Sequence, residues 1–256
     1  RSIPGNTLTS HRNTPVSFRD QCLYQIFCLA FETLKQIKSN GTITLAEGPY
    51  SLTDEEQSVI IKLCLNVNVT CLSFDFIGTN PEDSQEDVGT VQVPGVWRDL
   101  ISEVANLTLY FEFHKQMASI GQFDTSCLAL KVLVQMSSIR RSLFKDEKQR
   151  NAFLNVLISG IERILRESIG LNDQDNYHEF CRLLGRLKAN YQLSELVKTI
   201  SFASWLELTG TFTIASFDSW DSCMNSIHYL LALWGRVVSA LPYLRREEDE
   251  AKVTML

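Results

Sequence analysis

Long runs of apolar residues at helical spacing follow one another along this chain, and they restrict its fold more than any other feature. The first run, residues 18–37, has apolar side chains three and four residues apart. Further runs occur at 52–76, 96–104, 107–120, 124–139, 146–168, 173–190, 193–215 and 222–241. The stretch "KSNGTITLAEGPYS" (38–51) contains two glycines and a proline and is expected to be a loop. An all-α fold is therefore predicted.

Capping residues and polar stretches set the expected boundaries. Ser17 is expected to cap the first helix, and Thr53 with Glu56 three residues later has the pattern of a capping box. Residues 77–95 lack a helical period and hold two prolines and three glycines, so we expect a long acidic loop there. The expected organisation is a polar linker (1–16), a helical array (17–245) that includes this loop, and a charged tail (246–256).

The spacing of the helical runs favours a particular all-α architecture. Expected helix starts recur in pairs about every 40 to 50 residues, which is the period of HEAT-like repeats. We therefore predict a HEAT-repeat solenoid, a right-handed superhelix of about five stacked helix pairs. A closed helical bundle is the alternative that periodicity leaves open.

Composition excludes several classes of partner. The net charge is −6 and the pI is about 5.3, which argues against nucleic acid or an anionic membrane as the main partner, because both attract clustered Lys and Arg. No apolar run reaches the roughly 18 residues of a membrane span, and the first residues do not resemble a signal peptide. None of the seven cysteines lies in a CxxC pair, so free thiols in a reducing compartment are expected.

His178 and Cys181 form the one arrangement that could suggest catalysis, as a base and a nucleophile. A structural interpretation fits better, because Cys181 lies beside the apolar stripe of a helix starting near Asp173, where a thiol behaves as a small hydrophobe. The stripe consists of Tyr177, Phe180, Leu184, Leu187 and Tyr191. His178, Arg182 and Arg186 fall on the polar side. The sequence holds no nucleotide-binding, zinc-protease or hydrolase motif, so no catalytic residue, cofactor or metal is predicted.

Three charged groups are the candidate partner-binding residues. The candidates are Glu82, Asp83, Glu86 and Asp87 in the acidic loop, Arg140 and Arg141 at the end of the helix that finishes with "SSIRR", and Arg182 and Arg186, in one row with Lys188. The acidic group suits a basic protein surface, and the arginines suit an acidic one. The first two groups have an ordinary alternative: a solvated loop, and cations at the negative end of a helix dipole. For the third group, one face of each second helix in a solenoid lines the concave surface.

Several long segments resemble one known family. They are "SFRDQCLYQIFCLAFETLK" (17–35), "LSFDFIGTNPEDSQEDVGTVQVPGVWR" (72–98), "SSIRRSLF" (137–144), "NYHEFCRLLGRLKANYQLSELVK" (176–198) and "NSIHYLLALWGRVVSALPYLR" (225–245). In this order and with similar gaps, they are similar to segments of the exportin-7 family, Ran-dependent nuclear transport receptors of the importin-β superfamily.

The resemblance implies a stack of HEAT repeats that follows the amino-terminal Ran-binding domain of such a receptor. It implies binding to protein cargo, to the GTPase Ran in its GTP form and to nuclear pore proteins, and movement between nucleus and cytoplasm through the nuclear pore complex. It implies binding rather than an enzymatic reaction. The alternative is a HEAT-repeat scaffold that binds partners without Ran.

Overall fold

The computed structural model describes residues 18–74 and 90–244, apart from the side chains of Arg19, Asp20, Ser222 and Cys223. The chain divides into two compact units, residues 1–76 and 77–256, which are described separately. The expected cap Ser17, the linker 1–16, most of the loop 77–95 and the tail 246–256 lie outside the described residues.

The first unit is a helical hairpin with a small β-hairpin between its helices. A π-helical turn (Arg19–Leu23) leads into α2 (Tyr24–Asn40), and α2 packs against α3 (Asp54–Leu72). The predicted capping box is confirmed, since the Thr53 side chain accepts from Glu56 N and the Glu56 carboxylate accepts from Thr53 N. Phe27, Phe31, Leu34 and Leu65 are fully or almost fully buried.

The prediction of a plain loop at 38–51 was wrong. Strands β1 (Thr42–Leu45) and β2 (Gly48–Ser51) pair antiparallel, with Leu45 opposite Gly48. The alternation Thr-Ile-Thr-Leu suits a strand, and Gly48 takes the positive φ of +122° at the turn. Of the two glycines, Gly41 ends α2 just before β1, and Gly48 lies at the turn of the hairpin.

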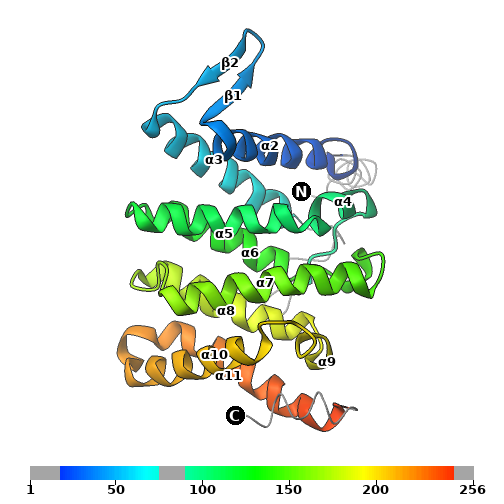
Figure 1. Ribbon diagram of the computed structural model, residues 1–256, viewed down its shortest axis with the longest axis vertical. Helices are drawn as coiled ribbons and strands as arrows, with labels where there is room; N and C mark the ends of the chain where they lie inside the picture. The colour runs from blue at the N-terminus through cyan, green and yellow to red at the C-terminus, as the bar shows by residue number, and fades with distance from the viewer. Residues whose placement is uncertain (1–17, 75–89, 245–256) are drawn as a thin grey trace, which may run out of the picture. The chain divides into compact units, whose positions relative to one another are not determined.

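The second unit consists of three long helix pairs and two short helices. Its helices are α4 (Arg98–Ser102), α5 (Val104–Ser119), α6 (Phe123–Ser137), α7 (Glu147–Glu167), α8 (Gln174–Asn190), α9 (Leu193–Leu196), α10 (Phe202–Asp218) and α11 (Trp220–Ala240). First helices α5, α7 and α10 pack in sequence order as one layer, and second helices α6, α8 and α11 form the other (Figure 1). This is the arrangement of stacked helix pairs, and the predicted all-α, HEAT-like fold is confirmed. With α2 and α3, the described residues hold four long pairs, against about five expected.

Aspartates fix the start of two helices in this unit. The Asp146 side chain accepts a hydrogen bond from Gln149 N at 2.8 Å, and Asp173 accepts one from Asn176 N at 3.0 Å. Each satisfies a backbone N–H that has no partner inside the helix. The predicted starts of these helices at 146 and 173 agree with these caps.

A single helix over 193–215 was predicted, and this was wrong. The chain leaves the helix after Leu196 and starts α10 at Phe202. The chain between the two helices is held by another segment, because Ile200 N donates to Asn155 Oδ1 in α7 at 2.9 Å. The Glu195 carboxylate caps the start of α9 by accepting from Gln192 N, and it pairs with two arginines from other segments. These tertiary contacts hold α9 and the segment after it in place, and an apolar pattern that continues through both does not show where the helix stops.

His114 ties three segments of the second unit together. Its ring is fully buried, with Nδ1 2.7 Å from Ser126 Oγ in α6 and Nε2 3.2 Å from the carbonyl of Ile169 in the loop before α8. Burial is the main cause that lowers the pKa of His114, so the neutral ring is favoured. None of the described helices is long and apolar enough to cross a membrane.

Candidate protein-binding surface

The second helices run parallel, so their carboxyl ends meet at one edge of their layer. At the starts of α6 and α8, Asn176 Nδ2 donates to the carbonyl of Phe123, and at their ends Tyr191 Oη donates to the carbonyl of Ile139. His178 lies 3.0 Å from Ser226 Oγ near the starts of α8 and α11. This edge carries Arg140, Arg141, Arg186, Lys188 and Arg236. Cations suit the negative ends of helix dipoles.

Arg140 and Arg141 lie just after α6 and not in its last turn, where the sequence predicts them. The two side chains contact different residues. The helix stops at Ser137, and Ile139 makes a parallel bridge with Val91. Arg140 is exposed, and its guanidinium donates to Gln92 Oε1 at 2.7 Å. Arg141 pairs at 3.0 Å with Glu195, which is 5% exposed. Of the two arginines, Arg140 is the one available to a partner, and Arg141 holds the fold.

Arg98 and Arg140 line a hollow of about 240 Å³ beside this edge. Arg98 Nε donates to the carbonyl of Leu143 at 2.6 Å, and Thr90 Oγ1 donates to Asn190 Oδ1 at 3.3 Å. Residues 90–93 therefore cross the carboxyl ends of α6 and α8. The acidic candidates Glu82, Asp83, Glu86 and Asp87 precede this segment and lie outside the described residues.

Arg182 and Arg186 do not form the open row that the helical pattern predicts. Arg182 is partly exposed and pairs with Glu179, three residues before it on the helix, at 3.4 Å. Arg186 is only 9% exposed, so its prediction on a polar, exposed face was wrong. The physical reason is that α8 is covered from both sides, by α6 and by α11. A single helical pattern cannot show that second contact.

A second hollow, the α8/α11 groove, was missed by sequence reasoning. It has a volume of about 630 Å³ between the carboxyl ends of α8 and α11. Its lining residues are Lys188, Ala189, Ala232, Gly235, Arg236, Ser239, Ala240 and Tyr243. Lys188 was noted in the arginine row, but Arg236 stands alone in the apolar run "LWGRVVSAL" and gives no local signal.

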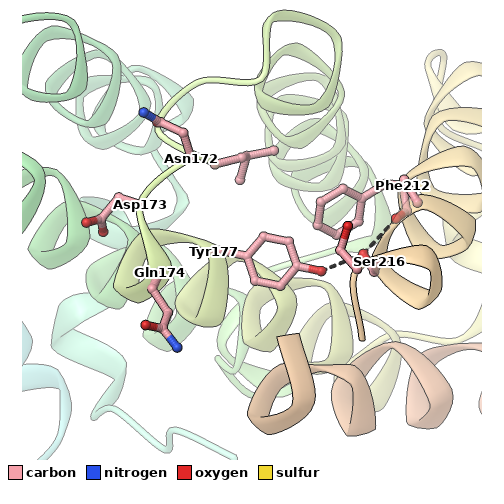
Figure 2. Close-up of a pocket in the computed structure, with 9 residues that line it drawn as sticks. Asn172, Asp173, Gln174, Tyr177, Phe212 and Ser216 are labelled. Atoms are coloured by element: carbon pink, nitrogen blue, oxygen red, sulfur yellow. Dashed lines mark hydrogen bonds between the residues drawn. The ribbon is translucent and has the colours of Figure 1, made fainter. Parts of the chain in front are cut away.

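A third hollow, of about 460 Å³, lies between the start of α8 and the end of α10, and the polar side chains of Asp173, Tyr177 and Ser216 in its lining make hydrogen bonds within the fold. Tyr177 Oη donates to Ser216 Oγ, and Ser216 Oγ donates to the carbonyl of Phe212, as Figure 2 shows. The Asp173 carboxylate points away from Tyr177 in this view and caps α8. No nucleophile and base converge here.

Cys181 and His178 are not placed as a catalytic pair. Cys181 is fully buried, as its position beside the apolar stripe predicted, and most of that stripe is buried with it. His178 Nδ1 faces Ser226 Oγ, and its ring meets Tyr229 edge-on at 5.5 Å between centroids. Among the residues with described side chains, no group of three or more His, Cys, Asp or Glu could hold a metal ion.

Comparisons with known proteins point to one group of relatives. No protein-family model matches the chain. It is 40% identical over 241 residues to exportin-7-B of Xenopus laevis. The matched residues make up 94% of this chain and 21% of that protein. It is 40% identical over 238 residues to Ran-binding protein 17 of Homo sapiens, a match of 93% of this chain and 21% of that protein. It is 36% identical over 244 residues to exportin-7 of Dictyostelium discoideum, a match of 95% of this chain and 22% of that protein. The resemblance carried by the five quoted segments is confirmed. The chain spans about a fifth of the length of these relatives.

Proposed function

Because exportin-7 and Ran-binding protein 17 match this chain along almost its whole length, we propose that it works as part of a Ran-dependent nuclear export receptor. In this proposal it binds protein cargo and Ran in the GTP form by non-covalent contacts. It would meet nuclear pore proteins on its way between nucleus and cytoplasm. The single observation that carries the proposal is the 40% identity over 94% of the chain.

The proposed mechanism is linkage between two ligands. Where Ran–GTP and cargo each favour the same curvature of a helical array, each raises the affinity for the other by the same factor. Stacked helix pairs suit this mechanism, because small rotations between neighbouring pairs add up along the stack. The loss of Ran–GTP would then weaken cargo binding through the change in curvature, and Ran itself would not have to touch the cargo.

The edge formed by the ends of α6, α8 and α11 supports a binding role. It exposes Arg140 and holds Lys188 and Arg236 beside a groove, and we propose it as a contact surface for an acidic region of a partner. The acidic residues Glu82, Asp83, Glu86 and Asp87 are proposed to meet a basic surface of cargo or of Ran.

A second candidate is a HEAT-repeat scaffold that binds partners without Ran. The observation that favours it is the coverage of only about a fifth of each relative, since the residues that bind Ran can lie in the other four fifths.

A pull-down from nuclear extract separates the two candidates. Immobilised chain is incubated with Ran locked in the GTP form, with Ran–GDP, or without Ran, and the bound proteins are quantified. Recovery that rises only with Ran–GTP is the result we expect from an export receptor. Equal recovery in the three samples would overturn the Ran-dependent function in favour of the scaffold. The Arg140→Glu variant tests the edge, and Lys198→Glu, at an exposed lysine paired with Glu147, is its control.

A further inference from the structure

Lys188 is a buried cation that forms no ion pair within the described part of the chain. It lies in the last turn of α8 and is 7% exposed. Arg236 approaches it from α11 and lines the same groove. Within the residues that the structure describes, neither side chain forms an ion pair, whereas Arg141, Arg150, Arg166 and Lys198 each pair with a glutamate.

Electrostatics makes this arrangement unfavourable when the groove is empty. Burial lowers the pKa of Lys188, and the positive charge of Arg236 lowers it further. A buried charge without a counter-ion costs free energy, and two like charges close together add to the cost. A carboxylate placed between them would offset both contributions, and it would act in a setting less screened than open water.

The groove is shallow and wide open to solvent, so an extended polypeptide can reach it without being enclosed. Small residues on both helices keep the groove free of bulky side chains: Ala189, Ala232, Gly235 and Ala240. A Cβ added at Gly235 would meet nothing within 4 Å. Tyr243 lines the groove and is 78% exposed as a residue, and so offers an aromatic face to an apolar side chain. A chain can therefore lie along the groove with its acidic side chains toward the two cations.

The position on the helices favours a carboxylate over a phosphate. Phosphate sites commonly use the free N–H groups at helix amino ends, but this groove lies at the carboxyl ends of α8 and α11, where carbonyl oxygens face outward. Those carbonyls repel a doubly charged anion more than a singly charged one. Recognition then depends on the two side-chain cations alone.

We propose that the α8/α11 groove binds an acidic, extended segment of a protein partner, whose carboxylates pair with Lys188 and Arg236. The inference rests on the proposed function in one respect, that this array binds other proteins, and it does not require Ran.

The test is direct binding without Ran, measured by fluorescence anisotropy. The probe is a short labelled peptide of alternating glutamate and alanine with one leucine, and the matched control peptide has glutamine in place of each glutamate. We compare the wild-type chain with Lys188→Met, which keeps an apolar stem of similar length, and with Arg236→Gln. Lys198→Met is the control variant, since it removes one exposed lysine outside the groove. Thermal unfolding checks that each variant is folded.

We expect the glutamate peptide to bind and the glutamine peptide to bind much more weakly. Lys188→Met and Arg236→Gln should each weaken binding about tenfold or more, and Lys198→Met should leave it unchanged. If Lys188→Met does not fold, Arg236→Gln carries the test. The Arg236 side chain is partly exposed, so shortening it opens no cavity in the core.

Three results would overturn the proposal. The first is equal binding of the two peptides, and the second is glutamate binding that neither groove variant weakens. The third involves the chain's own acidic residues Glu247, Glu248, Asp249 and Glu250. If the peptide binds only after these four are changed to their amides, the occupant is the chain itself and not a partner. A Ran-independent result in the pull-down would leave the groove proposal standing, so the two failures are distinguishable.

Discussion

Glu195 and Arg150 form an ion pair of 2.6 Å that joins α9 to the first turn of α7, and Glu195 is almost fully buried. The same carboxylate reaches Arg141, after the end of α6, at 3.0 Å. One acidic side chain therefore holds together segments from three successive parts of the array. Breaking a buried pair from one side leaves an uncompensated charge, so the site should be sensitive to substitution.

The Glu195→Gln variant should lower the free energy of unfolding by about 1–3 kcal/mol, because Arg150 is mostly buried whereas the 39% exposed Arg141 side chain is screened by water. Glutamine keeps the size of the side chain and an oxygen for Gln192 N, and it removes the charge that the two arginines face. Urea unfolding followed by circular dichroism measures the difference. The control is Glu147→Gln, whose exposed pair with Lys198 should contribute nothing measurable. Equal effects of the two substitutions would show that Glu195 has no special role.

His114 should make the stability of the second unit depend on pH. Burial lowers its pKa in the folded chain below the ordinary value of 6.5, so the unfolded chain binds the proton more tightly. Stability is therefore complete above the unfolded pKa and declines as the pH falls from there toward the lower folded pKa. Urea unfolding between about pH 7 and pH 5 measures this slope. The slope should shrink in His114→Gln and persist in His228→Gln, which changes an exposed histidine. An unchanged slope in His114→Gln would contradict the assignment.

Local patterns predicted the helices well, because their caps and stripes are local. Thr53 with Glu56, Asp146 and Asp173 begin helices where expected, and Phe180 and Leu184 are buried as their spacing indicates. Local patterns could not predict the contacts between segments that are distant in the sequence. The segment between α9 and α10 is held by Asn155, and α9 itself by two arginines, all of which lie 45 or more residues earlier in the sequence than the residues they contact.

The candidate surface was predicted only in part, for the same reason. The basic character near Arg140 and along α8 is visible in the sequence, but Arg186 is buried and Arg141 is used in the fold. The pairing of Lys188 with Arg236 arises because α8 and α11 run parallel and side by side. Forty-eight positions separate the two residues, and nothing in the local sequence links them.

Gly160 should be the glycine least tolerant of alanine in the helices of the second unit. It lies inside α7, and a Cβ there would fall on the ring of Phe111 in α5, far closer than carbon atoms pack. Phe111 is 2% exposed, so its ring has little room to move. Gly160→Ala should therefore destabilise the chain by about 1–3 kcal/mol, despite the better helix propensity of alanine.

Gly210→Ala is the matched control for this prediction. Gly210 also lies inside a helix, α10, but its added Cβ would meet only the Trp234 ring at 3.9 Å, an ordinary contact. It should be neutral or stabilising by up to about 1 kcal/mol. Thermal unfolding of the two variants side by side measures the difference. A stabilised Gly160→Ala variant would mean that α5 and α7 are not packed as closely as described.

The thiols should react in the order of their exposure, and this tests the catalytic alternative directly. Cys22 is exposed, whereas Cys64, Cys71 and Cys127 are buried, and burial raises the pKa of each of these three to about 11. A thiol reacts as the thiolate, so iodoacetamide at neutral pH should label Cys22 first and leave these three unmodified until the chain unfolds. Cys181 is fully buried and should also stay unmodified. Peptide mass spectrometry after timed labelling gives the order. Rapid modification of Cys181 in the folded chain, lost in His178→Ala, would support a nucleophile with its base and contradict a purely binding function.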